Sequence, residues 1–165
     1  MTEKPTYKEL EKRIQELEHV EYKLKRAEEA LHESEGRYRA VVEDMPGLIC
    51  SFLPGGEITF VNKAYCEYFD KTFEELVGTT FLSLIPESEQ KAVMDNISSL
   101  TVESPTKTHE HAVIAPNGDI CWQRWTNRAL FDDQGNTVGY QSIGMDITDR
   151  KRTEEALGER EERVS

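Results

Sequence analysis

The sequence lacks long hydrophobic runs, and this sets the first limits on what the chain can be. Of its 165 residues 37% are hydrophobic, and no apolar stretch approaches the ~20 residues that a membrane span requires. The N-terminal stretch MTEKPTYKEL has no apolar segment of the kind found in secretory signal peptides. We therefore expect a cytoplasmic protein that makes no contact with a membrane.

The chain has few cysteines, and its positive charges are outnumbered by its negative charges. The cysteines Cys50, Cys66 and Cys121 are odd in number and far apart, which matches neither a disulfide framework nor a zinc site. The 20 Lys and Arg residues stand against 32 Asp and Glu residues, which gives a net charge of −12. Phosphate contacts need clustered Lys and Arg. We expect reduced thiols, no metal site and no direct binding to nucleic acid.

Catalytic motifs are missing as well. The chain has no glycine-rich phosphate loop, no Ser-His-Asp order and no metal-hydrolase motif. His32 and Glu33 suggest a phosphoacceptor histidine, but the proline that normally follows such a box is absent. His109 and His111 share one face of a predicted strand without further metal ligands, so we expect solvated histidines. We predict no catalytic residue and no enzymatic activity.

Charged helix is abundant at both ends of the chain. KRAEEALHESEGR (25–37) and KRTEEALGEREER (151–163) are identical at nine of thirteen positions. Residues 6–35 contain no glycine or proline and carry apolar residues at near-heptad spacing, which predicts a helix that forms a parallel dimeric coiled coil. Glu21 and Glu28 interrupt the pattern, so a solvated single helix is the alternative. The predicted contact residues are Leu10, Ile14, Leu17, Leu24 and Leu31.

The segment between these helices predicts one antiparallel sheet with helices on one face. Gly36 is expected to weaken the long helix before a second, short one. A Pro-Gly-Gly turn between two short apolar runs predicts a hairpin, and Asn-Gly predicts another. Strands split around helices indicate a five-stranded α+β fold. We expect strands over 48–53, 57–62, 106–115, 119–131 and 137–147, and helices over 63–69, 72–78 and 86–100.

This order of elements resembles the PAS domain with its PAC tail, the sensory module of bacterial histidine kinases and diguanylate cyclases. The resemblance is carried by ITFVNKAYCEYFDKTFEELVGTTFLSLIPESE, by PNGDICWQRWTNRALFDDQGNTVGYQSIGMDITDRKRTEEAL and above all by DIT (146–148) followed by DRK. Lys63 and Ser88 depart from the residues that many members have. The resemblance implies an N-terminal coiled-coil helix (1–35), a sensor domain (36–148) and a C-terminal signalling helix (149–165).

One predicted strand, 119–131, offers candidate ligand-binding residues. Alternate side chains of a strand share a face, so Gln123, Trp125 and Asn127 lie together. The resemblance implies that this face looks toward the helices, where family members hold small ligands. The ligand is unknown, although an indole beside two amides suits a flavin or a small planar metabolite. The alternative is that the amides bond to backbone or water and that Trp125 belongs to the core.

The junction of the last strand with the C-terminal helix offers candidate signalling residues, Asp146 and Thr148. We expect Thr148 to cap the helix by accepting a hydrogen bond from a backbone N–H. Arg150 and Lys151 oppose the helix dipole, so we expect one of them to pair with Asp146 or with a glutamate of another helix. The resemblance implies that this junction passes a distortion of the sheet to the helix.

Together these features predict an intracellular signal-sensing PAS module. The module would bind a small ligand or cofactor and pass a conformational change through its flanking helices to an output domain or partner. That partner would be a kinase, cyclase or response domain of a phosphorelay or second-messenger pathway. A ligand-free PAS module for dimerisation and protein interaction is one alternative, and the sensory fragment of a histidine kinase is another.

Overall fold

The first compact unit of the protein is helical. The computed structural model describes residues 3–164 and separates a unit that ends at Val41 from one that begins at Val42. Helix α1 (Tyr7–Asp44) supplies the first unit and the start of the second. Its N-terminus is a capping box, in which the Thr6 hydroxyl accepts from the Glu9 N–H at 3.2 Å and the Thr6 N–H donates to the Glu9 carboxylate at 3.1 Å.

The predicted weak point at Gly36 does not separate two helices, and that prediction is wrong. Helix α1 continues through Gly36 to Asp44. A single glycine costs a helix only about 1 kcal/mol relative to alanine. The strong helix formers on both sides of Gly36 outweigh this cost.

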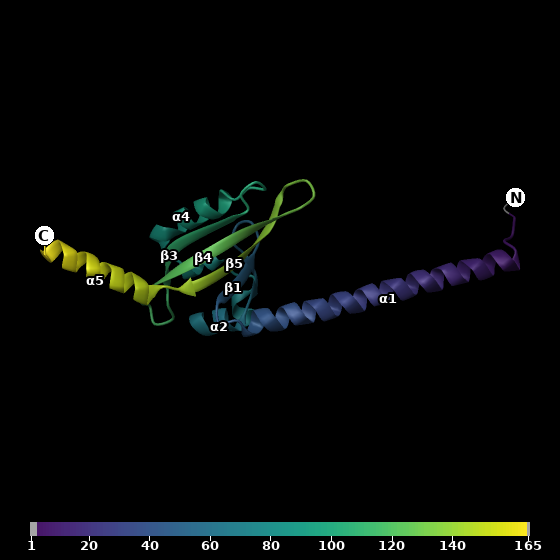
Figure 1. Cartoon of the computed structure of the whole chain (residues 1–165), viewed down its shortest axis with the longest axis horizontal. Helices are drawn as coiled ribbons and strands as arrows, with labels where there is room; N and C mark the ends of the chain where they lie inside the picture. The colour runs from purple at the N-terminus through teal and green to yellow at the C-terminus, as the bar shows by residue number, and fades with distance from the viewer. Residues whose placement is uncertain (1–2, 165) are drawn as a thin grey trace. The chain divides into compact units, whose positions relative to one another are not determined.

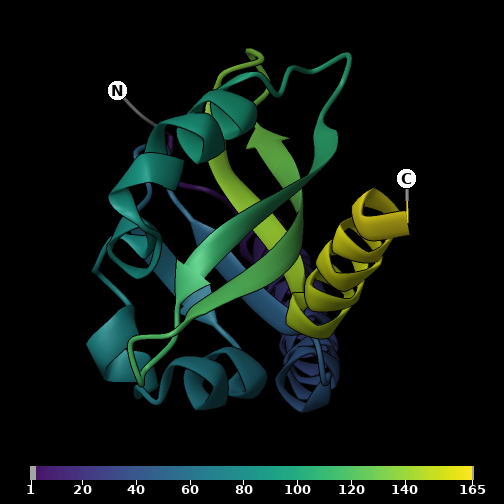
Figure 2. The same ribbon diagram turned by 90° about the vertical axis from the view of Figure 1, so that its left-hand side faces the viewer.

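The second unit contains a five-stranded antiparallel sheet. Figures 1 and 2 show that helices cover one of its faces. The strand order is β2-β1-β5-β4-β3, so the first and last strands of the chain are neighbours. This confirms the predicted α+β fold. The strands are β1 (Leu48–Phe52), β2 (Ile58–Val61), β3 (Thr106–Ile114), β4 (Ile120–Phe131) and β5 (Thr137–Asp146). The helices are α2 (Lys63–Phe69), α3 (Phe73–Leu76), the 3-10 helix η1 (Phe81–Leu84), α4 (Glu87–Ser98) and α5 (Thr148–Val164).

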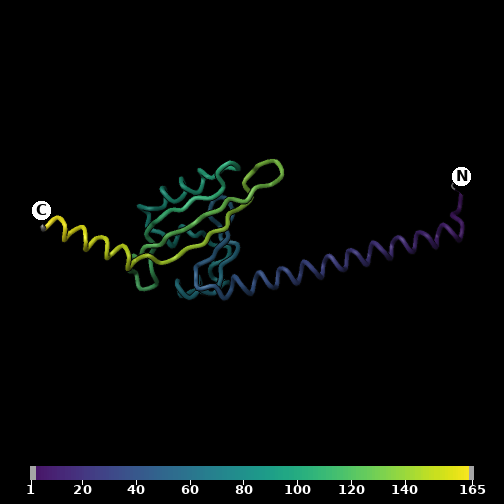
Figure 3. Tube along the Cα trace, viewed as in Figure 1, coloured from purple at the N-terminus to yellow at the C-terminus, as the bar shows by residue number. Residues whose placement is uncertain are grey.

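Local sequence explains the tight connections that the Cα trace follows in Figure 3. Between β3 and β4, Gly118 has a φ of 86°, a conformation that glycine adopts without strain. The side chain of Asn117 accepts from the Asp119 N–H at 3.0 Å and closes this turn. Thr72 accepts from the Glu75 N–H at 3.2 Å and begins α3. Helix η1 follows a bridge between Glu57 and Thr80 and was not predicted.

The core lies between the sheet and helices α2 to α4. Alternate residues of β1 point into it, beginning with Leu48 and ending with Phe52, and both are buried. Helix α4 contributes Val93 and Ile97 from its apolar face. The same inner face of the sheet carries polar residues in the middle of β4, and these lead to the candidate site.

Candidate functional site

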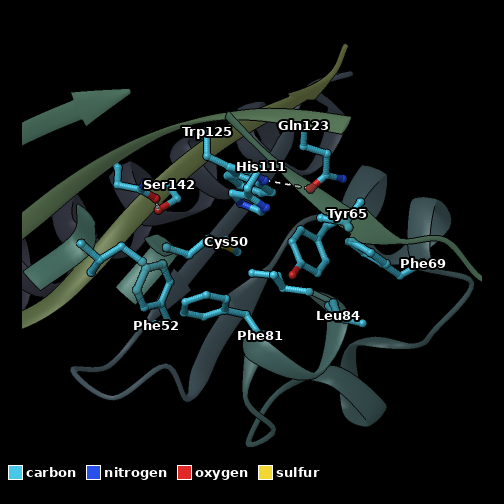
Figure 4. A pocket seen from close by; sticks show the side chains of 15 residues that line it. Cys50, Phe52, Tyr65, Phe69, Phe81, Leu84, His111, Gln123, Trp125 and Ser142 are labelled. Atoms are coloured by element: carbon cyan, nitrogen blue, oxygen red, sulfur yellow. Dashed lines mark hydrogen bonds between the residues drawn. The ribbon is translucent and has the colours of Figure 1, made fainter. Parts of the chain in front are cut away.

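A cavity lies inside the second unit, between the sheet and helices α2, η1 and α4 (Figure 4). Its open volume is about 30 Å³, which is room for roughly two waters. Gln123, Trp125 and Asn127 of β4 all lie on its wall, and all three are buried. The alternation of β4 therefore brings the three predicted residues to one cavity.

Trp125 and Gln123 hold one another in place. The indole N–H of Trp125 donates to Gln123 Oε1 at 2.8 Å. The indole ring lies against Gly144, the residue opposite Trp125 in β5, where a Cβ atom would come within 2.6 Å of the ring. Gln123 is fully buried, and its Nε2 has no hydrogen-bond partner among the described residues.

His111 of β3 also lines the cavity, so the prediction that both strand histidines are solvated is wrong for His111. His111 lies two positions before Val113, so the two side chains share the inward face of β3. This spacing from an apolar residue was the sequence feature that could have predicted the burial of His111. Burial lowers the pKa of His111, which keeps its imidazole neutral at neutral pH. His109 is only half-buried, and no group of three or more His, Cys, Asp or Glu residues within 3–164 could hold a metal ion.

The remaining polar groups of the wall are neutral too. Ser142 of β5 donates to Asn127 Oδ1 at 2.5 Å. Burial raises the pKa of the Cys50 thiol to about 12, so Cys50 stays protonated. The cavity is therefore a small, mostly apolar space with a few neutral polar groups.

These walls do not fit a flavin. Sites for ligands of that size usually have volumes of ~300–1,000 Å³, whereas this cavity has room for roughly two waters. The face of Trp125 that lies against Gly144 offers no space for stacking, because even one added carbon would clash there. A planar ligand of flavin size would require the helices to move away from the sheet.

Asp146 joins three elements at the end of β5. Its Oδ1 accepts from the backbone N–H of Thr148 at 2.8 Å, and its Oδ2 accepts from the hydroxyl of Tyr68 in α2 at 2.6 Å. Partial burial acts to raise the pKa of Asp146, but these hydrogen bonds outweigh it and hold the pKa below its ordinary value.

Thr148 does not have the predicted capping role. Its hydroxyl accepts from the backbone N–H of Trp122 in β4 at 3.0 Å, so it ties α5 to the sheet. The neighbouring Ile147 N–H donates to the Trp122 carbonyl at 2.8 Å. Asp146 receives the helix amide instead, because it precedes Thr148 by two residues, as in an Asx turn.

The first turn of α5 is held to the sheet by Glu110, an outward-facing residue of β3. Glu110 pairs with Arg150, with Lys151 at 3.2 Å and with Arg124 of β4 at 3.2 Å. The Lys151 ammonium also lies 5.1 Å from the centre of the Trp122 ring. The expected partner of Arg150 and Lys151, Asp146 or a glutamate of another helix, is therefore wrong, because their partner comes from a strand.

Replacing Glu110 with glutamine is expected to loosen the first turn of α5. The hydrogen bond from Arg150, and then that from Lys151, hold the pKa of Glu110 below its ordinary 4.5. Its stabilising effect is therefore complete above about pH 4.5 and is lost as the pH falls through the lower folded-state pKa. Hydrogen-exchange protection of residues 149–153 should fall on acidification, and less so in Glu110→Gln because that variant has already lost the pairing.

The control is Glu155→Gln, which changes an exposed glutamate of the same helix. It should leave the acid response of α5 as it is in the unmodified protein. Equal responses in Glu110→Gln and Glu155→Gln would show that the pairing of Glu110 does not hold α5.

Asn62, which directly precedes the helix predicted over 63–69, is a structural centre that the sequence analysis did not identify. Its Oδ1 accepts from the backbone N–H groups of Ile49 and Tyr65 at 3.0 and 3.1 Å. Its Nδ2 donates to the carbonyls of Val42 and Gly47 at 3.0 and 2.9 Å. The side chain is fully buried. One amide thus joins the end of α1, the start of β1 and the cavity-lining helix α2.

Known proteins share this architecture. The family model described as PAS fold matches residues 42–152. The two-component sensor PprA of Pseudomonas aeruginosa is 29% identical over 133 residues, which is 81% of this chain and 14% of PprA. The probable diguanylate cyclase DgcE of Escherichia coli is 26% identical over 147 residues, which is 88% of this chain and 13% of DgcE. The chain therefore spans only a small part of either relative.

The fold is also found in a crystal structure, that of the PAS domain of an HTR-like protein from Haloarcula marismortui. It covers 74% of this chain and 99% of that one, with a TM-score of 0.63 and 21% identity. Among residues 3–164, none of the helices combines the length and the apolar composition of a membrane span. The family match spans the sheet, the cavity and the Asp146 junction, and it confirms the resemblance seen in the sequence. This chain belongs to the PAS family of sensory domains.

Proposed function

We propose that this chain is a cytoplasmic sensor that binds a small molecule in its cavity and transmits occupancy to α5, and that it has no catalytic activity of its own. The observation that carries the proposal is the shared carboxylate of Asp146. Tyr65 and Phe69 of α2 line the cavity, and Tyr68 of the same helix donates to Asp146. Asp146 also receives the first amide of α5.

This arrangement supports a simple mechanism. A ligand that moves α2 relative to the sheet would change the geometry between Tyr68 and Asp146. The hydrogen bond from the Thr148 amide to the Asp146 carboxylate would then weaken or strengthen. The first turn of α5 would become less or more stable as a result. The ligand can shift this equilibrium only by its difference in affinity for the two arrangements.

Strand β3 supports a second connection between the cavity and α5. His111 lines the cavity from the inner face of β3, and the preceding residue, Glu110, pairs with Arg150 and Lys151 on the outer face. A displacement of His111 would move Glu110 with it, because adjacent residues share one peptide unit. The two connections reach α5 from opposite faces of the sheet.

Replacing Tyr68 with phenylalanine tests the first connection. We expect the fold to remain, because the aromatic ring stays and Tyr68 is only half-buried. Hydrogen-exchange protection of the Thr148 amide should fall about threefold to tenfold, which corresponds to the loss of roughly one hydrogen bond. Tyr38→Phe, on an exposed tyrosine of α1, is the matched control and should have no effect. Unchanged protection in Tyr68→Phe would contradict the proposed path.

The same proposal includes a homodimer formed through α1. Leu10, Ile14 and Leu17 are 43%, 54% and 66% exposed, and Leu24 and Leu31 are also exposed. Leucines at heptad spacing on a helix of 38 residues are typical of a coiled coil, in which a second helix covers them.

Two pairs of substitutions test the dimer. Leu17→Gln with Leu24→Gln should turn a dimer into a monomer in analytical ultracentrifugation, because two apolar contacts are lost from each helix. Lys12→Gln with Lys23→Gln, at positions off the leucine repeat, should leave the dimer intact. A monomeric unmodified chain at micromolar concentration would contradict the proposal.

The proposed output is a kinase, cyclase or response domain in a phosphorelay or second-messenger pathway. The relatives that support it are a two-component sensor and a probable diguanylate cyclase. The chain would then act as the sensory part of such a system. One such case is the sensory end of a histidine kinase.

The small cavity favours one second candidate, a PAS module that works without a ligand through dimerisation and docking. In native mass spectrometry of the purified protein, an added mass that disappears on denaturation would favour the sensor over this candidate.

A further inference from the structure

Two polar atoms of the cavity wall lack partners within the described residues, and one of them is a hydrogen-bond donor. Gln123 Oε1 is taken by the Trp125 indole at 2.8 Å. An indole N–H can only donate, so the amide cannot flip without losing this bond. Gln123 Nε2 is therefore left as a buried donor that has no acceptor in the described part of the chain. Such a group is costly to bury, so an acceptor placed beside it would be favoured.

The second polar atom is an acceptor, on His111. Its Nδ1 lies 3.0 Å from the carbonyl oxygen of Ala112, and because a carbonyl only accepts, Nδ1 carries a proton. The neutral imidazole then has its free lone pair on Nε2. No residue between 3 and 164 donates to that nitrogen. His111 and Gln123 line the same cavity from neighbouring strands and are opposite one another in the β3–β4 register.

No charge in the wall could compensate a charged ligand. The described residues that line the cavity include no Lys, Arg, Asp or Glu. His111 and Cys50 are both neutral near pH 7 because of burial. An ion placed in such a site loses its hydration and gains no partner, which is strongly unfavourable.

We propose that the cavity binds a small uncharged compound that offers an acceptor to Gln123 Nε2 and a donor to His111 Nε2, as a primary amide or a diol does. The open space suits only a few non-hydrogen atoms, since it has room for roughly two waters. This inference rests on the proposed sensing function and gives it a class of ligand. It also replaces the flavin-sized ligand that the sequence suggested.

Three compounds of nearly equal shape test the class: acetamide, acetate and acetamidinium. The full chain, labelled with ¹⁵N, is titrated with each and followed by NMR. Acetamide should bind with a Kd in the millimolar range, as expected for about four heavy atoms, and should shift the Gln123 side-chain amide and the His111 Nε2 signals. Acetate and acetamidinium should bind about a hundredfold more weakly or not at all.

Substitutions assign the site. Gln123→Leu should weaken acetamide binding about tenfold. Gln141→Leu, on an exposed residue of β5, is the matched control and should leave binding unchanged. If Gln123→Leu does not fold, the shifts of the Gln123 amide in the unmodified chain still decide the question. Acetate that binds as well as acetamide, or a Gln123 amide that responds to none of the three compounds, overturns the proposal.

The experiment distinguishes a failure of the proposed ligand class from a failure of the proposed sensing function. Acetamide binding without any change in hydrogen exchange at α5 would support the ligand class and contradict the sensing function. A charged compound that binds and changes exchange at α5 would contradict the ligand class and support the sensing function.

Discussion

Replacing Asn62 with alanine is expected to lower the free energy of unfolding by about 3–5 kcal/mol. The substitution removes four hydrogen bonds from a fully buried side chain. It leaves the N–H groups of Ile49 and Tyr65 without their acceptor, and an unsatisfied buried group costs about 1–3 kcal/mol. Urea unfolding followed by tryptophan fluorescence measures the change, because both tryptophans lie in the second unit.

Asn96→Ala is the matched control for Asn62→Ala. Asn96 lies in α4, is half-buried, and its Oδ1 has no hydrogen-bond partner among the described residues. Alanine is the better helix former, so this change should cost less than about 1 kcal/mol. Both variants must be compared at one protein concentration if the chain dimerises. Similar losses at the two positions would show that Asn62 is not a structural centre.

Replacing Gly144 with alanine is expected to lower the free energy of unfolding by about 2–4 kcal/mol and to rearrange the cavity. The added Cβ would come within 2.6 Å of the Trp125 ring, so the indole must move and its bond to Gln123 must lengthen or break. Urea unfolding gives the loss of stability. A shift in the tryptophan emission maximum reports the new position of the indole.

A control variant and a second background test whether the effect of Gly144→Ala comes from the contact with Trp125. Gly158→Ala in α5, where a Cβ meets nothing within 4 Å, should raise stability slightly. In a Trp125→Leu background, Gly144→Ala should cost much less, because the ring it collides with is gone. A double-mutant cycle measures this coupling, which should exceed about 1 kcal/mol. Additive effects of Gly144→Ala and Trp125→Leu would contradict the contact.

Much of the fold follows from local patterns. The alternation in β4 was sufficient to place Gln123, Trp125 and Asn127 on one face, and the resemblance to the family implied that this face looks toward the helices. The Asn-Gly turn and the helix cap at Thr72 are equally local. These features need no knowledge of which strands are neighbours.

The junction could not be predicted in the same way, because its contacts depend on strand order. Glu110 meets Arg150 because β3 lies beside β4 and α5 starts at that side of the sheet. Tyr68 meets Asp146 across 78 positions of sequence. The four bonds of Asn62 likewise join segments that only the folded chain brings together. The helix η1 has four residues, too few for a periodic pattern.

The cavity was also beyond local reasoning. The sequence identifies an indole and two amides on one face, but it does not show that Gly144 receives the indole ring. Nor does it show that Gln123 already holds the indole N–H. These two contacts reduce the space and leave one free donor, so they change the expected ligand from a planar cofactor to a small uncharged molecule.

Hydrogen exchange at the first turn of α5, with the cavity empty and filled, is the most direct test of the account. We expect acetamide to fill it reversibly and Val113→Ile to fill it permanently, because the substitution adds one methylene group to its wall. We predict that each changes the protection of the Thr148 and Lys151 amides at least twofold, through Asp146 and Glu110. Protection at α5 that stays constant while the Gln123 amide signal shifts would contradict the claim that the cavity and the helix are coupled.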